Sequence, residues 1–462
     1  MDNNSEWTIL SLAPLIRRRK ISPVELTAFC LDRISKLQPA INAFITVRED
    51  IALAQAKRAE MDISRGRYKG VLHGIPISVK DLFCTRGIRT TAGSKILRRF
   101  VPERNAEVIE RLLASGCTFL GKTNMHEFAY GATNLNPYYG PVRNPWDTSR
   151  ISGGSSGGSA ASVVTAQAVA SIGTDTGGSI RIPSAACGCV GLKPTYGRVS
   201  LEGVIPLSGT LDHAGPICRC VADAALMFDA MAQSRVRAPG TPGTTISGLR
   251  RGVKSIRLGV PRQYFFDHLQ PAVRRNVLAA VKTLKELGAS LREVNLKGME
   301  ETARLAADIT AGEALAFHEE WLNKRPEEYG KDVGARLEQS RGLTAAAYIQ
   351  ALQKRLAYTE EFERVLDSVD LILAPAIPVV APGLDQEQVR TGRSRTDVRL
   401  ALLSLTRPAN LTGLPALSVP CGFSPDNLPI GLQLIGRRFG EATLLRAAWA
   451  YEQATPWHRQ FP

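Results

Sequence analysis

Two clusters of glycine and serine, at 152–159 and 175–181, constrain the fold of this chain more than any other feature. Such clusters are common in flexible linkers, but the segment between these two, 160–172, consists mostly of small and apolar residues. Glycine placed among buried elements indicates that backbones approach closely or adopt unusual dihedral angles. Consecutive glycines ahead of a serine can also direct several N–H groups at one point, as an oxyanion requires. We therefore expect both clusters to belong to a packed core.

A serine in either cluster needs a base, because the hydroxyl is a weak nucleophile on its own. Neither cluster contains a histidine. The available candidate is Lys80, which follows a short apolar segment, 74–79, that we predict to be a buried strand. Burial lowers the pKa of a lysine and makes the neutral amine accessible. The residues therefore indicate a serine hydrolase whose base is a lysine.

Helical and strand patterns alternate along the chain, which favours an α/β sandwich with a mixed or parallel sheet. With 462 residues, 44% of them hydrophobic, the chain can bury a large core. A capping box with proline at the first helical position starts a helix at Ser22. We predict further helices over 51–65, 108–114, 159–167, 271–287 and most of 300–369. We predict strands over 74–79, 117–120, 168–172, 257–261, 371–375, 414–419 and 430–435, with an exposed connection over 235–252.

Three motifs suggest other activities, and the surroundings of each argue against it. The segment 116–123 matches a phosphate loop, but its interior residues favour a strand rather than a flexible turn. The tripeptide 175–177 resembles an aspartic protease corner, which requires two carboxylates, yet it occurs once. The segment 153–157 matches a nucleophile elbow followed by Asp212 and His213, but no buried strand leads into it. None of these activities is preferred.

The composition bears on partners and location. The chain has 58 Lys and Arg against 43 Asp and Glu, a net charge of +15. Such a basic balance is typical of proteins that bind nucleic acid. The basic residues are scattered, so neither nucleic acid nor a membrane is expected. The first ten residues lack the basic end and apolar run of a signal peptide, which favours a cytoplasmic location. We interpret the eight cysteines, including the pairs Cys187/Cys189 and Cys218/Cys220, as buried thiols rather than disulfides or zinc ligands.

Ordered motifs along nearly the whole chain resemble the amidase signature family of serine hydrolases. They lie at 74–81, 121–128, 143–146, 152–159, 175–181, 191–195, 413–415 and 429–433. The resemblance implies a large mixed β-sheet core sandwiched between α-helices. It also implies a single amidase domain over 1–462, with a signature core at about 70–220. We expect a helical insertion at about 265–370 to shape the substrate pocket.

The resemblance also implies the site. Lys80 matches the family's catalytic lysine, Ser155 its middle serine with a cis peptide bond at Gly154–Ser155, and Ser179 its acylated nucleophile. We favour Ser155 over Ser156 as the proton relay. The backbone amides of Thr176, Gly177, Gly178 and Ser179 are expected to form the oxyanion hole, with Asp175 and Arg181 as a supporting ion pair. No metal or organic cofactor is implied.

The chain is predicted to act alone, as an amidase on non-peptide C–N bonds. The alternative is the glutamine-hydrolysing subunit of a transfer RNA-dependent amidotransferase. Two features expected of that subunit are missing: an aspartate within 402–406 and a tyrosine–aspartate pattern within 311–321. A non-catalytic scaffold or nucleic-acid-binding protein is a further alternative, against which intact Lys80, Ser155 and Ser179 argue.

The substrate is expected to be a small amide, ester or carbamate (urethane), handled by a monomer or homodimer. The variable segments 128–139, 306–321 and 377–395 hold several aromatic residues, which predicts a roomy apolar acyl or aryl site. The candidate pocket residues are Met125, Phe128, Tyr130, Tyr138 and Phe317, with Tyr139 and Trp321 as further aromatic candidates, although some of these side chains could instead pack the core.

Overall fold

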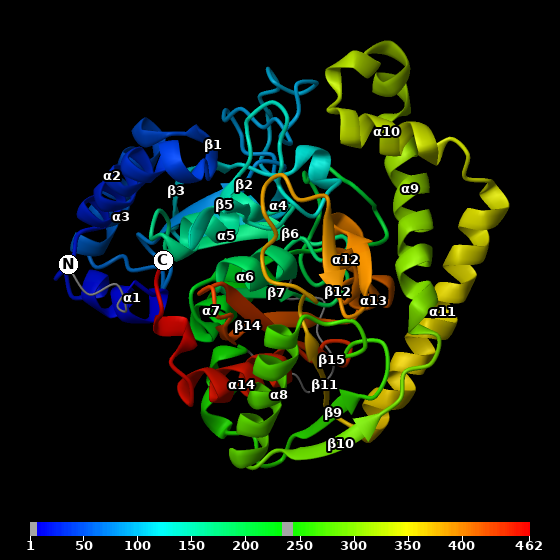
Figure 1. The fold of residues 1–462 in the computed structure, drawn as a ribbon. Helices are drawn as coiled ribbons and strands as arrows, with labels where there is room; N and C mark the ends of the chain where they lie inside the picture. Colours follow the sequence, from blue (N-terminus) through cyan, green and yellow to red (C-terminus); the bar gives the residue numbers. More distant parts are fainter. Residues whose placement is uncertain (1–6, 233–243) are drawn as a thin grey trace.

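The computed structural model describes residues 7–232 and 244–462, and a mixed eleven-stranded sheet runs through it (Figure 1). The strand order is β1-β3-β2-β6-β8-β7-β14-β15-β11-β9-β10. Parallel pairing joins β3, β2 and β6 at one end and β11, β9 and β10 at the other, with antiparallel strands between them. The strands are β1 Phe44–Val47, β2 Pro76–Lys80, β3 Thr118–Thr123, β6 Ala170–Thr174, β7 Val190–Lys193, β8 Ala214–Cys218, β9 Arg257–Pro261, β10 Ser290–Val294, β11 Leu371–Pro375, β14 Ala416–Phe423 and β15 Pro429–Gly436.

Helices pack along the length of this sheet, as expected for the predicted α/β fold. The long helices α9 and α11 lie side by side at the edge of the molecule farthest from α1–α3 (Figure 1). The helices are α1 Ile9–Arg17, α2 Pro23–Ile41, α3 Glu49–Ser64, α4 Glu107–Ala114, α5 Gly157–Val164, α6 Arg181–Cys187, α7 Val221–Met231, α8 Pro271–Glu286, α9 Met299–Lys324, α10 Lys331–Ser340, α11 Ala345–Ser368, α12 Val398–Ser404, α13 Arg407–Leu411 and α14 Glu441–Gln453.

Local sequence explains where several elements begin. The Ser22 hydroxyl accepts hydrogen bonds from the N–H groups of Val24 and Glu25, and the Glu25 carboxylate accepts one from the Ser22 N–H. This reciprocal arrangement satisfies donors that a helix start leaves free, which confirms the predicted capping box of α2. All residues of β2 are buried, as is usual for a strand between two parallel neighbours.

The first glycine–serine cluster lies in the core, as predicted. Every residue of α5 is buried, and α5 contacts β2, β6 and β8. A Cβ atom on Gly158 would lie 2.4 Å from the carbonyl oxygens of both Ala43 and Asn124. Real Cβ atoms do not approach backbone so closely, so only glycine fits at this position. The cluster therefore allows a helix to pack directly against neighbouring backbone.

The segment that matches a phosphate loop forms strand β3, as its residue types predicted, and Lys122 within it is buried. The insertion expected at about 265–370 is not purely helical, because β10 pairs with β9 and extends the main sheet. The sequence of β10 gave no strand signal, because most of its side chains are exposed and an edge strand of this kind needs no apolar face. Residues 235–243 of the predicted exposed connection lie outside the described residues. The rest of it is not exposed throughout, because it forms the short helix η3 Ile246–Arg251, in which Leu249 is buried.

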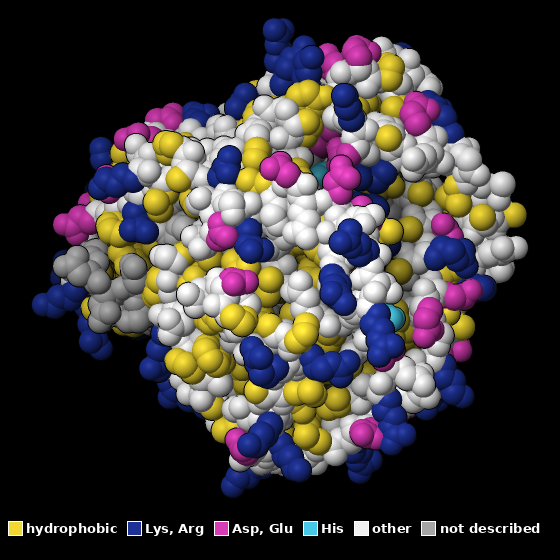
Figure 2. All heavy atoms as spheres, viewed as in Figure 1, with side chains coloured by type: hydrophobic (Ala, Val, Ile, Leu, Met, Phe, Trp, Pro, Cys, Tyr) yellow, Lys and Arg dark blue, Asp and Glu magenta, His cyan; other side chains and the backbone are white. Residues whose placement is uncertain are grey.

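Two small hairpins lie outside the main sheet: β4 Arg143–Asn144 with β5 Asp147–Ile151, and β12 Gln388–Thr391 with β13 Ser394–Asp397. All eight cysteines are free thiols, and only Cys84 among them is partly exposed. Across residues 7–232 and 244–462, no helix combines the length and apolarity needed to cross a bilayer. Lys and Arg are spread over the face in Figure 2 with Asp and Glu among them, in agreement with the scattered charge of the sequence.

Candidate active site

The last residues of two neighbouring strands place the candidate base. Lys80 ends β2 and Thr174 ends β6, and the two strands pair in parallel, so both side chains reach the same edge of the sheet. The Lys80 ammonium nitrogen lies 2.7 Å from the Ser155 hydroxyl and 2.8 Å from the Thr174 hydroxyl. Lys80 and Ser155 are fully buried. The structure therefore brings together two of the three predicted catalytic side chains.

The environment of Lys80 favours its neutral form. Burial lowers the pKa of Lys80 to about 7, although the charges of Asp212 and Asp175 act in the opposite direction. Within the described residues no carboxylate accepts a hydrogen bond from its amine, which contacts two hydroxyl groups instead. At neutral pH a large fraction of such an amine is unprotonated, so it can accept a proton from Ser155.

Ser155 and Ser156 point to different partners. The peptide bond Gly154–Ser155 is cis, as the family resemblance implied. The Ser155 hydroxyl contacts Lys80, whereas the Ser156 hydroxyl donates to the Thr174 carbonyl at 3.2 Å. A Cβ atom on Gly154 would lie 2.8 Å from the Asn134 nitrogen, so this loop also depends on a close backbone approach. The contacts favour Ser155 over Ser156 as the group that exchanges a proton with Lys80.

The loop between β6 and α6 presents Ser179 together with free backbone donors. The N–H groups of Ile180 and Arg181 donate to the Asp175 carboxylate. Within the described part of the chain, the N–H groups of 176–179 have no acceptor, and the Ser179 hydroxyl makes no hydrogen bond. Gly178 has a φ of +137°, which L-residues with side chains rarely adopt. These unpaired backbone donors beside a hydroxyl would be available to an oxyanion, and the oxyanion hole stays a prediction.

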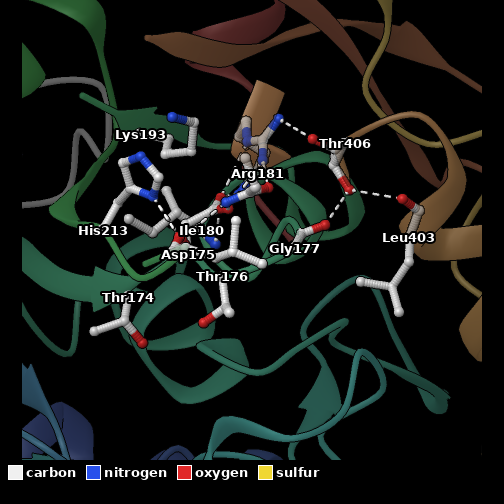
Figure 3. A network of polar contacts seen from close by, with 12 residues as sticks. Thr174, Asp175, Thr176, Gly177, Ile180, Arg181, Lys193, His213, Leu403 and Thr406 are labelled. Carbon is white, nitrogen blue, oxygen red and sulfur yellow. Dashed lines mark hydrogen bonds and ion pairs between the residues drawn. The ribbon is translucent and has the colours of Figure 1, made fainter. Parts of the chain in front are cut away.

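A buried ion pair holds this loop in place (Figure 3). Arg181 contacts both carboxylate oxygens of Asp175, at 3.0 and 2.9 Å, and both side chains are completely buried. Burial alone would raise the pKa of Asp175, but the charge and hydrogen bonds of Arg181 hold it well below its usual range. The remaining Arg181 donors reach the Thr406 carbonyl and the side chains of Gln433 and Asn410. Asp175 and Arg181 thus hold the loop, and within the described residues neither side chain forms a hydrogen bond with Lys80, Ser155 or the Ser179 hydroxyl.

Ser179 lies on the wall of a small cavity. The cavity is small: about 30 Å³ is open to the centre of a water-sized sphere, within about 370 Å³ of non-atom space that includes solvent at its mouth. Thr176, Gly177 and Ser179 form one side, and Ala306 and Thr310 of α9 contribute to another. Tyr130, Leu403, Arg399 and Arg407 complete much of the wall, with Leu207 and two small residues. The predicted insertion therefore reaches this cavity through α9.

Of the predicted pocket residues, Tyr130 lines this cavity. Phe128 and Met125 are buried in the core, and Phe128 packs edge-on against His318 with ring centroids 4.3 Å apart. Phe317 is 38% exposed and packs against His318 and Trp321. The Tyr138 hydroxyl donates to the Glu328 carbonyl at 2.8 Å. These four side chains do not belong to the wall beside Ser179, which combines apolar residues with threonines and two arginines.

Four side chains near the site were not predicted: Thr174, Asp212, Arg399 and Arg407. The Thr174 position, directly before the second cluster, is a signal that could have been used. Asp212 appeared in the sequence only as part of an elbow motif. It accepts a hydrogen bond from the Thr176 hydroxyl and from the N–H groups of Leu207 and Ser208. Burial raises the pKa of Asp212 to about 6.

The comparisons with known proteins identify the family of this chain. A family model described as Amidase matches residues 25–445. The chain belongs to the amidase signature family. A curated relative, a glutamyl-tRNA(Gln) amidotransferase subunit of Geobacter sp. (strain M21), is 40% identical over 485 aligned positions, which cover 98% of each chain.

Solved structures of amidase signature enzymes have the same fold. One titled as the crystal structure of an amidase superposes with a TM-score of 0.89 at 37% identity, over 97% of this chain and 99% of the other. Another, with a TM-score of 0.91 and 35% identity over 97% and 98%, comes from a vestigial protein complex related to the origins of an s-triazine catabolic enzyme. The family and the α/β fold with its large mixed sheet are thus established for this chain.

Proposed function

We propose that this chain hydrolyses the C–N bond of a small primary carboxamide, with Ser179 as nucleophile, Ser155 as proton relay and Lys80 as base. The observation that carries the proposal is the 2.7 Å contact between the buried Lys80 amine and the Ser155 hydroxyl. The next residue, Ser156, donates its N–H to the Ser179 carbonyl at 3.2 Å, which links this pair to the loop that carries Ser179. Membership of the amidase signature family supports the same chemistry.

In the first half-reaction the Ser179 oxygen attacks the amide carbon, and its proton passes to Ser155 as the Ser155 proton moves to neutral Lys80. The N–H groups of 176–179 stabilise the oxyanion of the tetrahedral intermediate. The proton then returns through Ser155 to the leaving nitrogen, because an amide anion is too poor a leaving group. The C–N bond breaks, ammonia leaves, and Ser179 carries the acyl group.

In the second half-reaction a water molecule attacks the acyl carbon and delivers one proton through Ser155 to Lys80. Collapse of the second intermediate breaks the bond to the Ser179 oxygen, which regains a proton by the same route. The products are a carboxylic acid and ammonia. Every proton transfer in this scheme uses side chains of this chain, so the scheme needs neither a metal ion nor an organic cofactor.

A second candidate specifies the substrate as glutamine. The curated relatives are named as glutamyl-tRNA(Gln) amidotransferase subunits, with 40% identity to the one from Geobacter sp. (strain M21) and 43% to the one from Chloroflexus aggregans. Their names favour the amidotransferase role over the stand-alone amidase that the sequence analysis ranked first. In that role the chain would work with other subunits, in the cytoplasm, and supply ammonia. Against it stand the missing aspartate and tyrosine–aspartate pattern.

The test measures ammonia release by the purified chain from glutamine and simple primary amides, and release of the amine, alcohol or phenol from aryl amides, esters and carbamates, with Ser179→Ala as the control. Ammonia release that needs Ser179 supports the proposed function. Activity confined to glutamine would favour the amidotransferase role, and activity confined to aryl esters or carbamates would contradict the proposal. Equal activity of Ser179→Ala would contradict the assignment of the nucleophile.

A further inference from the structure

Two arginines in the cavity beside Ser179 have no acidic partner. Arg399, on α12, and Arg407, the first residue of α13, both line the cavity. Within the described part of the chain neither guanidinium forms an ion pair, and the buried Nε of Arg399 has no hydrogen-bond partner. Arg407 is 6% exposed and donates to the Ala303 carbonyl.

Other buried or half-buried arginines nearby are neutralised. Arg181 is paired with Asp175, and Arg336 contacts the Asp332 carboxylate at 2.6 Å. The Arg336 and Arg399 guanidiniums both lie near the Tyr130 ring, at 5.3 and 6.0 Å from its centroid. Because Asp332 offsets Arg336, the wall retains the positive charges of Arg399 and Arg407.

The electrostatics agree with two uncompensated cations. Burial lowers the pKa of Arg399, and the charge of Arg336 lowers it further, while Asp397 and Asp332 act weakly in the opposite direction. Burial is the main cause that lowers the pKa of Arg407 to about 10, and the positive charge of Arg399 is the second. Removing charged groups from water costs free energy unless an opposite charge is supplied. An anion bound in the cavity would supply it.

We propose that Arg399 and Arg407 bind a carboxylate of the substrate, at the end of the acyl chain opposite the amide attacked by Ser179. This inference rests on the proposed function and names its substrate class: monoamides of short dicarboxylic acids. Guanidinium groups match carboxylates through paired, charge-assisted hydrogen bonds. The cavity is small, with about 30 Å³ open to the centre of a water-sized sphere, so it favours a short acyl chain over a bulky one.

The same wall disfavours an ammonium group on the substrate. The described residues that line the cavity include no aspartate or glutamate. The α-ammonium of glutamine would therefore lie near two guanidiniums with no carboxylate to bind it, which is a repulsive arrangement. We thus expect glutaramate, which is glutamine without its amino group, to be a better substrate than glutamine.

The substrate test uses matched amides at pH 8, where carboxylates are ionised. Glutaramate and succinamate are compared with valeramide and butyramide, in which a methyl group replaces the carboxylate, and glutamine is included. For at least one pair, kcat/KM should be higher by roughly tenfold or more for the amide that carries a carboxylate. Most of this difference should come from a lower KM. Arg399→Gln should remove the preference, because it should lower kcat/KM for the acids far more than for the uncharged amides. Arg395→Gln, an exposed arginine on the neighbouring β13, should keep it.

A binding experiment keeps the inference testable without turnover. Calorimetry with Ser179→Ala should show tighter binding of an acid than of its uncharged match, and the added Arg399→Gln change should abolish the difference. Equal binding and equal kcat/KM for acid and uncharged amides would overturn the carboxylate subsite, even if the amidase activity stands. Glutamine used as well as glutaramate would overturn the discrimination against ammonium. A wild-type chain that fails to react with a fluorophosphonate would instead contradict the proposed function.

Discussion

Two buried lysines on adjacent strands, Lys80 on β2 and Lys122 on β3, have similar burial and different surroundings. Both are at most 1% exposed, and burial lowers the pKa of Lys80 to about 7 and that of Lys122 to about 8. Lys122 donates to the Phe83 carbonyl and to the hydroxyls of Thr85 and Thr90. Its amine also lies 3.9 Å from the Asp81 carboxylate.

Lys80 contacts two hydroxyl groups, of which Ser155 belongs to the candidate site. The comparison teaches that burial makes either amine easier to deprotonate, whereas the contacts decide what the amine can do. Lys122 holds the segment that follows β2 in place and lies beside its acidic residue Asp81. Lys80 is placed to exchange a proton with a serine beside the cavity that Ser179 lines.

Replacing Lys80 gives the largest expected effect on activity. Lys80→Met should lower kcat by roughly 10²–10⁴-fold, because the proton from Ser155 loses its acceptor. The thermal unfolding midpoint should change little, since the methionine fills much of the same volume. Amide turnover and thermal unfolding measured on the same preparation check both statements. Retained turnover would remove Lys80 from the mechanism.

The two serines give the next contrast. Ser155→Ala should lower kcat by roughly 10²–10⁴-fold, whereas Ser156→Ala should have a milder effect. The reason is that the Ser155 hydroxyl contacts the lysine amine, while the Ser156 hydroxyl donates to a backbone carbonyl. Single-turnover assays of the two variants give the comparison. Equal losses would put the relay assignment in doubt.

Lys122→Met should act on stability rather than on chemistry. The change leaves Asp81 buried without its cation, and one Asp81 oxygen already lacks a hydrogen-bond partner within the described residues. Breaking a buried ion pair in this way costs about 3–5 kcal/mol of folding free energy. We expect a lower midpoint in chemical denaturation, with most of the kcat retained by the folded fraction. A variant as stable as the wild type but inactive would reverse the roles assigned to the two lysines.

The pH dependence of kcat/KM is the smallest of these effects, and it should depend on Lys80 but not on Lys122. Because Lys80 has to be unprotonated and its pKa is about 7, kcat/KM should rise with pH through about 7 and level off above it. Below that value the rate should fall by roughly tenfold per pH unit, as one protonation inactivates the base. Lys122→Met should keep this profile. A rate maximum below about pH 6 in the folded enzyme would indicate another base.

The sequence predicted much of the local structure around the candidate site because its signals are local. The apolar segment before Lys80 predicted a buried strand, and the glycines around Ser155 and Ser179 predicted close backbone approaches. The roles came from family motifs at the same positions. The structure places Lys80 and Ser155 in contact and Ser179 on a cavity wall, while the catalytic roles stay predictions.

The cavity itself could not be predicted from local patterns. Arg399 and Arg407 come from helices far along the chain, and nothing in the sequence around them marks a cavity. Aromatic residues give the same pattern in a core and in a pocket. Phe128 therefore suggested a roomy apolar site, but its ring packs against His318 in the interior. Which side chains face the reacting serine depends on how α9, α12 and the loop after β6 pack together.

The most direct test of the central claim is the site of covalent labelling by a fluorophosphonate, mapped by mass spectrometry. The account predicts a single adduct on the Ser179 oxygen. Labelling should be absent in Ser179→Ala, strongly slowed in Lys80→Met, and slower below about pH 7 in the wild type. An adduct on Ser155 or Ser156, or undiminished labelling of Ser179→Ala, would contradict the account.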